Sequence, residues 1–189
     1  MTEFQMQDGG LLSERSTHEI AQSLAQRTGG DPLTHEAHQT FIRVYTTLTG
    51  AVRKNSPSSL SLGRYNVLRF LYTADEHRLL MSELGDRLEV SATVVTRLVE
   101  SLVEEGLVRR EGHDSDKRKT WASLTPAGEA LFESELPLML ELIEDLWQGL
   151  RDDEKRLLIH LLTKLRISLL SLDTLAHPNA SGLRSPAVD

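Results

Sequence analysis

The sequence predicts a mainly α-helical fold with a small β-hairpin wing, in which a winged helix-turn-helix is joined to long dimerisation helices. Two short helical patterns, at 82–88 and 91–105, follow one another directly. Two strand-like runs, at 107–110 and 120–124, come next. The last helical pattern, from residue 152, is apolar on nearly all of its sides, which is unusual for a helix at the surface of a monomer.

Composition narrows the class of protein. The chain has 189 residues and no cysteine, which excludes disulfides, thiolate metal sites, iron–sulfur clusters and cysteine nucleophiles. No apolar run reaches the roughly 18 residues of a membrane span. The first ten residues lack the basic region of a signal peptide, so we expect a cytoplasmic protein without membrane contact. The formal net charge of −7, taken alone, argues against nucleic acid as a partner.

The N-terminal part divides at glycine and proline. Residues 1–33 are expected to form a flexible or partly helical arm, because glycine pairs interrupt it and only Leu11 to Gln26 is weakly periodic. A helix follows over 34–55, with Thr34 as its N-cap and an apolar stripe along one side. The next helix begins after Ser61.

The middle of the chain, 56–125, is expected to be the winged helix-turn-helix. The two short helices open on Ser82 and Ser91, both good N-caps, and Gly106 ends the second in the usual position after a helix. The segment 111–119 is then the loop of a hairpin.

The C-terminal part is expected to hold two long helices, from 126 to about 150 and from 152 to about 172. In a chain of this size, the missing cover for the apolar last helix is most simply a second copy across a two-fold axis. Residues 34–55 and 126–174 would then form a dimerisation region, followed by a disordered tail over 175–189. The alternative is a helix at the centre of a monomeric bundle.

The second short helix presents a surface suited to a DNA groove. Periodicity directs five residues to the core: Val95, Leu98, Val99, Leu102 and Val103. The opposite face and the helix start carry small or hydrogen-bonding residues and one guanidinium: Ser91, Ala92, Thr93, Thr96 and Arg97. No acid occurs from Ser91 to Val99. These residues are predicted to meet base edges, with Arg97 able to bind guanine in a bidentate way.

The hairpin loop has a basic tip. Lys117 and Arg118 are predicted to contact DNA, with Arg118 in the adjacent minor groove and Asp116 pairing with a neighbouring arginine. Of Arg109 and Arg110, one is expected to bond locally while the other reaches a phosphate.

Two strings resemble the multiple-antibiotic-resistance regulator (MarR) family of bacterial transcription factors. They are SELGDRLEVSATVVTRLVESLVEEGLVRR, from Ser82, and DSDKRKTWASLTPAGEALF, from Asp114. The family's wing reads Asp-x-Asp-Arg-Arg, matched here by Asp114, Asp116 and Arg118 with Lys117 in place of the first arginine, and its exit Leu-Thr-x-x-Gly is matched by 124–128. Gly85 stands where the family usually has alanine, and the 33-residue arm is longer than usual.

The resemblance implies a homodimer that binds a pseudo-palindromic operator. It implies repression, relieved when a small aromatic or phenolic ligand enters a crevice between the dimer helices and the DNA-binding lobe. The polar-tipped or charged candidates for that crevice are Tyr45, Tyr65, Arg69 and Tyr72, for which packing or surface roles are the alternative.

The distribution of charge removes the objection to DNA. Residues 53–121 hold 12 basic and 11 acidic residues, so the lobe is close to neutral and the rest of the chain carries −8.

No cofactor or metal is expected, because His35 and His38 have no second ligand cluster at suitable spacing. No catalytic motif is visible either, so an enzyme is not expected. The rival interpretation is a winged-helix adaptor that binds proteins without reading DNA.

Overall fold

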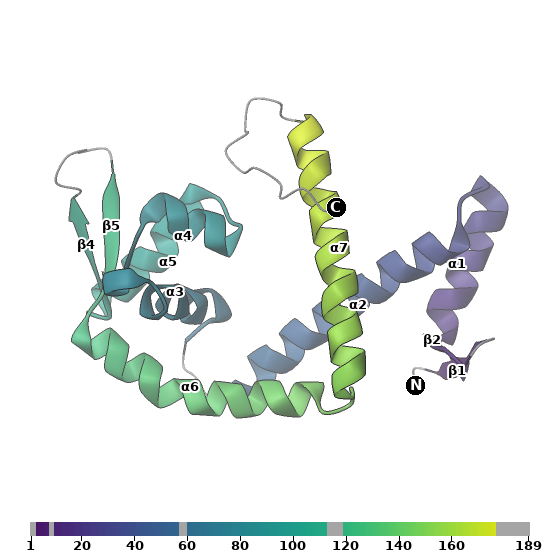
Figure 1. Ribbon diagram of the computed structural model, residues 1–189, viewed down its shortest axis with the longest axis horizontal. Coiled ribbons are helices and arrows are strands. Elements are labelled where there is room, and N and C mark those ends of the chain that lie inside the picture. Colours follow the sequence, from purple (N-terminus) through teal and green to yellow (C-terminus); the bar gives the residue numbers. More distant parts are fainter. Residues whose placement is uncertain (1–2, 8–9, 57–59, 113–118, 177–189) are drawn as a thin grey trace. The chain divides into compact units, whose positions relative to one another are not determined.

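The computed structural model describes residues 3–7, 10–56, 60–112 and 119–176 (Figure 1). These residues are mostly helical with a small antiparallel sheet, which confirms the predicted fold class. The chain divides into two compact units, Met1–Leu146 and Trp147–Asp189. Within the described ranges, no helix has both the length and the apolar character that crossing a bilayer requires.

The arm begins with a hairpin. Strands β1 (Phe4–Met6) and β2 (Leu12–Glu14) pair antiparallel, with Phe4 opposite Glu14. Helix α1 (Arg15–Thr28) follows; it overlaps the weakly periodic stretch Leu11 to Gln26 and ends two residues beyond it. The hairpin was not expected, because three-residue strands leave no measurable alternation in a sequence.

Helix α2 (Pro32–Asn55) packs along α1 and begins two residues earlier than predicted. The Asp31 carboxylate caps it, accepting the N–H groups of Leu33 at 3.1 Å and Thr34 at 3.0 Å. The prediction that Thr34 is the N-cap is therefore wrong. Pro32 explains the shift, because its fixed φ favours the first helical position and leaves the cap to the residue before it.

The lobe opens with helix α3 (Leu62–Tyr72) and a short 3₁₀ turn (Asp75–His77), then strand β3 (Arg78–Leu80). Helix α4 (Met81–Leu88) starts one residue before the predicted cap Ser82. That cap assignment is wrong, because the Glu83 carboxylate instead accepts the Leu80 N–H at 2.8 Å.

The rest of the lobe follows the prediction more closely. Helix α5 spans Ala92–Glu104 with Ser91 at the N-cap position, and strand β5 spans Thr120–Leu124. Strand β4 (Val108–Gly112) runs two residues further than predicted. The three strands form a sheet in the order β3-β5-β4, in which β5 is central. The third strand, β3, was not predicted.

The lobe has a closed apolar core. Val95, Val99 and Leu102 of α5 are fully buried in it, as predicted, and Leu98 is half-buried against Gly63. The prediction for Val103 is wrong, since it is 37% exposed in the last turn of α5. The other core residues with almost no exposure are Val67, Leu68, Leu71, Leu84, Ala122 and Phe132.

Helix α6 (Pro126–Trp147) leaves the sheet through the Leu-Thr-x-x-Gly motif. The Thr125 hydroxyl donates to the Gly106 carbonyl at 2.7 Å and accepts the Gly128 N–H at 3.1 Å. Gly128 lies so close to the chain that a Cβ there would be 2.1 Å from the Leu107 carbonyl oxygen. The motif therefore fastens the start of α6 to the start of the wing.

The second unit is built on helix α7 (Asp152–Ala176). The Glu154 carboxylate accepts the Arg151 N–H at 2.9 Å and so caps its start. No side chain described in α7, up to Leu172, is buried. Nine large apolar residues of the helix are exposed: Leu157, Ile159, Leu161, Leu162, Leu165, Ile167, Leu169, Leu170 and Leu172.

Candidate nucleic-acid interface

The start of α5 carries the predicted base-reading residues on its outer side. Ser91, Ala92, Thr93 and Arg97 are exposed. Arg97 forms no ion pair with any other residue that the structure describes, so its guanidinium is available to an external partner. Thr96 differs from the prediction in being half-buried, because it turns towards α4 and the wing strands.

A cleft of about 170 Å³ lies where the start of α4, helix α5 and the wing strands meet. It is lined by two apolar residues, Leu80 and Met81, and by five polar or charged ones, Ser82, Thr96, Arg110, Lys119 and Thr120. The structure thus brings together two predicted residues, Thr96 and Arg110. It adds three that sequence reasoning missed, Ser82, Lys119 and Thr120. Of these three, only Lys119 could be identified from the sequence, because it lies in the basic string of the wing.

The two arginines of β4 are both paired with acids. Arg109 Nε lies 2.8 Å from Glu111, whose carboxylate also accepts the Ser123 hydroxyl at 3.3 Å. Arg110 Nη1 lies 3.6 Å from Glu100, a looser contact. Exposed pairs of this kind contribute only about 0–1 kcal/mol, so a phosphate can compete for the guanidinium. Arg110 is better placed than Arg109 to bind a phosphate, because it also lines the cleft.

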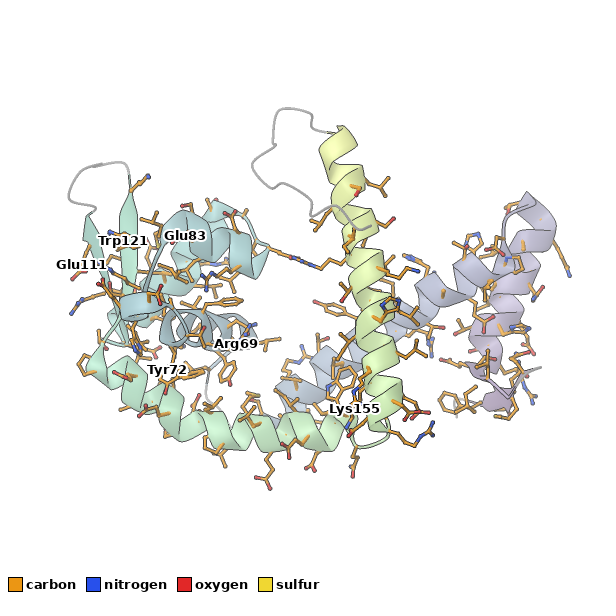
Figure 2. All side chains as sticks on the ribbon, viewed as in Figure 1. Arg69, Tyr72, Glu83, Glu111, Trp121 and Lys155 are labelled. Carbon is orange, nitrogen blue, oxygen red and sulfur yellow. The ribbon has the colours of Figure 1, made fainter. Side chains whose placement is uncertain are left out.

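The wing strands are anchored at their base. Gly112 and Thr120 form the last described pair of the hairpin before its tip. The Arg78 guanidinium of β3 lies 4.9 Å from the centre of the ring of Trp121 on β5, a residue labelled in Figure 2. The predicted contacts Asp116, Lys117 and Arg118 lie outside the described residues, as does Asp114 of the wing motif.

The effector candidates of α3 point in different directions. Tyr65 is buried, and its ring and that of Tyr72 lie 5.4 Å and 4.9 Å from Phe132 of α6. The Tyr72 hydroxyl donates to Glu133 at 3.1 Å, and this bond to a carboxylate raises the pKa of Tyr72. Figure 2 shows Tyr72 on the side of α3 that faces α6. Both tyrosines therefore pack α3 against α6.

Arg69 and Tyr45 lie apart from that aromatic cluster. Arg69 is exposed, stacks 4.3 Å over the Phe70 ring and donates from Nε to Asn66 at 3.2 Å. Tyr45, on α2, is 59% exposed. The four candidates are thus not gathered around one cavity in a single chain.

Comparison with known proteins finds transcriptional regulators of similar sequence and fold. The MarR family model matches residues 58–119. The transcriptional repressor YetL of Bacillus subtilis is 35% identical over 106 residues, which cover 56% of this chain and 64% of YetL. The chain therefore aligns with a little under two thirds of that relative's length.

Solved structures agree in fold. A MarR variant from E. coli, determined with operator DNA, is 27% identical, has a TM-score of 0.62, and matches over 68% of this chain and 91% of its own. BpsR of Bordetella bronchiseptica, whose DNA binding is regulated by 6-hydroxynicotinic acid, is 23% identical with a TM-score of 0.63, over 68% and 91% of the two chains. Together with the three-stranded winged fold and the wing-exit motif, these matches show that the chain is similar to MarR family regulators in the sequence of its lobe and in its fold.

Proposed function

We propose that the protein is a homodimeric, DNA-binding transcriptional repressor that reads a pseudo-palindromic operator, acting in the cytoplasm and not as an enzyme. The observation that carries the proposal is the exposed, acid-free start of α5, with the unpaired Arg97, beside a cleft lined by Arg110 and Lys119. The names of its relatives support it, since YetL is a repressor and MarR was solved on operator DNA.

The roles of the residues follow from their positions. The first residues of a recognition helix meet base edges in the major groove, which assigns Thr93 and Arg97 to base reading. Arg110 and Lys119 supply positive charge beside that helix, and the hydroxyls of Ser82 and Thr96 supply hydrogen-bond donors. Such groups bind backbone phosphates, which fix the register of a protein on the duplex.

The exposed apolar residues of α7 support the homodimer. A two-fold axis would present two copies of α5 to half-sites one helical turn, or a multiple of one, apart. Arg118 of each wing would reach the flanking minor groove, and Lys117 and Asp116 stay predicted contacts beside it.

We further propose that a small aromatic or phenolic effector releases the DNA. BpsR supports this by analogy, since its DNA binding responds to 6-hydroxynicotinic acid. The candidate residues remain Tyr45, Tyr65, Arg69 and Tyr72. Any crevice that includes exposed Tyr45 or Arg69 would have to be completed by assembly of the dimer.

The test is an equilibrium titration of promoter DNA from the protein's own genomic neighbourhood, with the Arg97→Ala variant. Loss of a bidentate base contact is expected to lower specific affinity by about 1–3 kcal/mol and to relax base preference at one position of each half-site. Arg27→Ala is the matched control, because it removes one exposed arginine from α1, outside the lobe. Equal affinity and equal base preference of Arg97→Ala and wild type would overturn the assignment and favour the adaptor alternative.

A further inference from the structure

Helix α5 carries an acid directly beside its base-reading residues. Glu100 follows Thr93 by seven positions and Arg97 by three, a spacing that places the three side chains on one side of the helix. The acid-free start of the helix ends at Glu100, whose side chain is 56% exposed. An exposed carboxylate on a surface that meets phosphates opposes DNA binding. Its presence there therefore calls for a specific reason.

The partner of Glu100 is Arg110 of β4, whose Nη1 atom lies 3.6 Å from the Glu100 carboxylate. The strand register explains why Arg110 reaches α5. Arg110 is paired with Ala122 of β5, which is fully buried, so both residues lie on the face of the sheet that packs on the lobe core. Arg109 and Glu111 alternate with Arg110 along the strand and pair with each other on the opposite face. In the described part of the chain, Glu100 is therefore the acid that Arg110 meets.

The same arginine belongs to the cleft. Arg110 lines it together with Thr96, which precedes Glu100 by one turn of α5. One guanidinium thus faces two negative groups, the Glu100 carboxylate of the free protein and a backbone phosphate of bound DNA.

The length of the contact decides what Glu100 does to Arg110. At 3.6 Å it is longer than a charge-assisted hydrogen bond, and it joins a single nitrogen to a single oxygen. Such a pair attracts the guanidinium without fixing its direction, whereas an acid that orients an arginine for a phosphate holds it by short, paired bonds. Glu100 therefore offsets the charge of Arg110 and does not aim it.

We propose that Glu100 restrains DNA binding, because its carboxylate neutralises Arg110 in the free protein and a phosphate has to displace it. The inference rests on the proposed function and adds a residue that sets the strength of phosphate binding. Since phosphates are the same at every base pair, the restraint acts on operator and unrelated DNA alike, and the choice of bases stays with Arg97. Weaker binding to unrelated DNA leaves less of the protein on the many competing sites of a genome.

The first test is an equilibrium titration of wild type and Glu100→Gln with promoter DNA from the protein's own genomic neighbourhood and with an unrelated duplex of equal length. Glutamine keeps the size of the side chain and removes its charge, so Kd is expected to fall about two- to fivefold for both duplexes, with unchanged base preference. A Kd for Glu100→Gln that equals or exceeds that of wild type overturns the inference.

Glu104→Gln is the matched control. Glu104 is an exposed acid one turn further along the same side of α5, and it forms no ion pair with another residue that the structure describes. Its substitution is expected to leave both values of Kd near those of wild type. An equal gain in Glu104→Gln would show that any acid lost from α5 strengthens binding, which also overturns the inference.

A second measurement shows whether Glu100 acts through Arg110. Arg110→Gln is expected to weaken binding to both duplexes and to lower the slope of log K against log[salt] by about 0.9, the share of one phosphate contact. In that background Glu100→Gln is expected to bring no further gain, because the guanidinium that it neutralises is gone. An unchanged slope in Arg110→Gln, or a gain that persists in the double variant, overturns the inference.

The wild-type titration separates this inference from the proposed function. If wild type binds its promoter DNA while the variants behave against expectation, the restraint is wrong and the DNA reader stands. If wild type binds neither duplex at micromolar concentration, both are overturned. Glu100 and Arg110 are exposed, so neither substitution disturbs the core, and Glu100→Ala repeats the test with a good helix former.

Discussion

Gly128 illustrates how a single residue holds the lobe together. It lies against the backbone of Leu107, at the start of the wing, while the Thr125 hydroxyl bridges the same turn. The resemblance to a family identifies this motif from the sequence, but the reason for a glycine lies in the approach of the Leu107 carbonyl, 21 residues earlier in the chain. Gly85 is the opposite case, since a Cβ there would make ordinary contacts of 3.5 Å with Val95.

Gly128→Ala is therefore expected to destabilise the protein by about 1–3 kcal/mol or more, because the obstructing atoms are backbone and yield only if α6 shifts. Urea unfolding followed by circular dichroism measures the change. Gly112→Ala serves as the control, because a Cβ there meets nothing within 4 Å. If Gly128→Ala unfolds at the same urea concentration as Gly112→Ala, the proposed close approach is wrong.

At the scale of elements, the sequence predicts those whose signal is local. Helix α5 and strand β5 appear nearly at their predicted bounds, because periodicity and caps specify them within a dozen residues. Strand β3 pairs with residues some 40 positions later, and its three residues carry no pattern of their own. The cleft was missed for the same reason, since Ser82, Thr96 and Lys119 meet only when α4, α5 and the wing assemble.

The cap of α2 gives an element-scale prediction about pH. The Thr34 hydroxyl, followed by the N–H groups of Thr34 and Leu33, donates to the Asp31 carboxylate and lowers the pKa of Asp31 in the folded state. The charged form is thus favoured by folding. The stabilisation that the ionised Asp31 carboxylate gives the folded state is fully present above the unfolded pKa, near 4. It is lost as pH falls through the lower pKa of the folded state.

Asp31→Asn isolates this contribution, because asparagine still caps a helix but does not titrate. Below about pH 4 the wild type is expected to lose melting temperature more steeply than the variant, and the two curves should run parallel above it. Thermal unfolding from pH 2 to 7 makes the comparison. Parallel curves throughout the range would show that the Asp31 cap does not favour the ionised carboxylate.

At the scale of the whole molecule, the net charge of −7 conceals two different parts. The lobe between residues 53 and 121 is close to neutral, and two of its basic residues, Arg110 and Lys119, line the cleft. The acids are concentrated elsewhere, with six on α6 and no base beside them. The net charge alone argues against nucleic acid as a partner of this protein. The position of Arg97, Arg110 and Lys119 suggests the opposite.

Footprinting on the DNA upstream of the protein's own gene tests the central proposal most directly. A dimer that presents two copies of α5 is expected to protect two half-sites whose centres are about 10 base pairs, or a multiple of that, apart. Arg97→Ala is expected to require a higher concentration for the same protection. No protection at micromolar protein, or protection with no paired half-sites, would contradict the account of this chain as a dimeric reader of DNA.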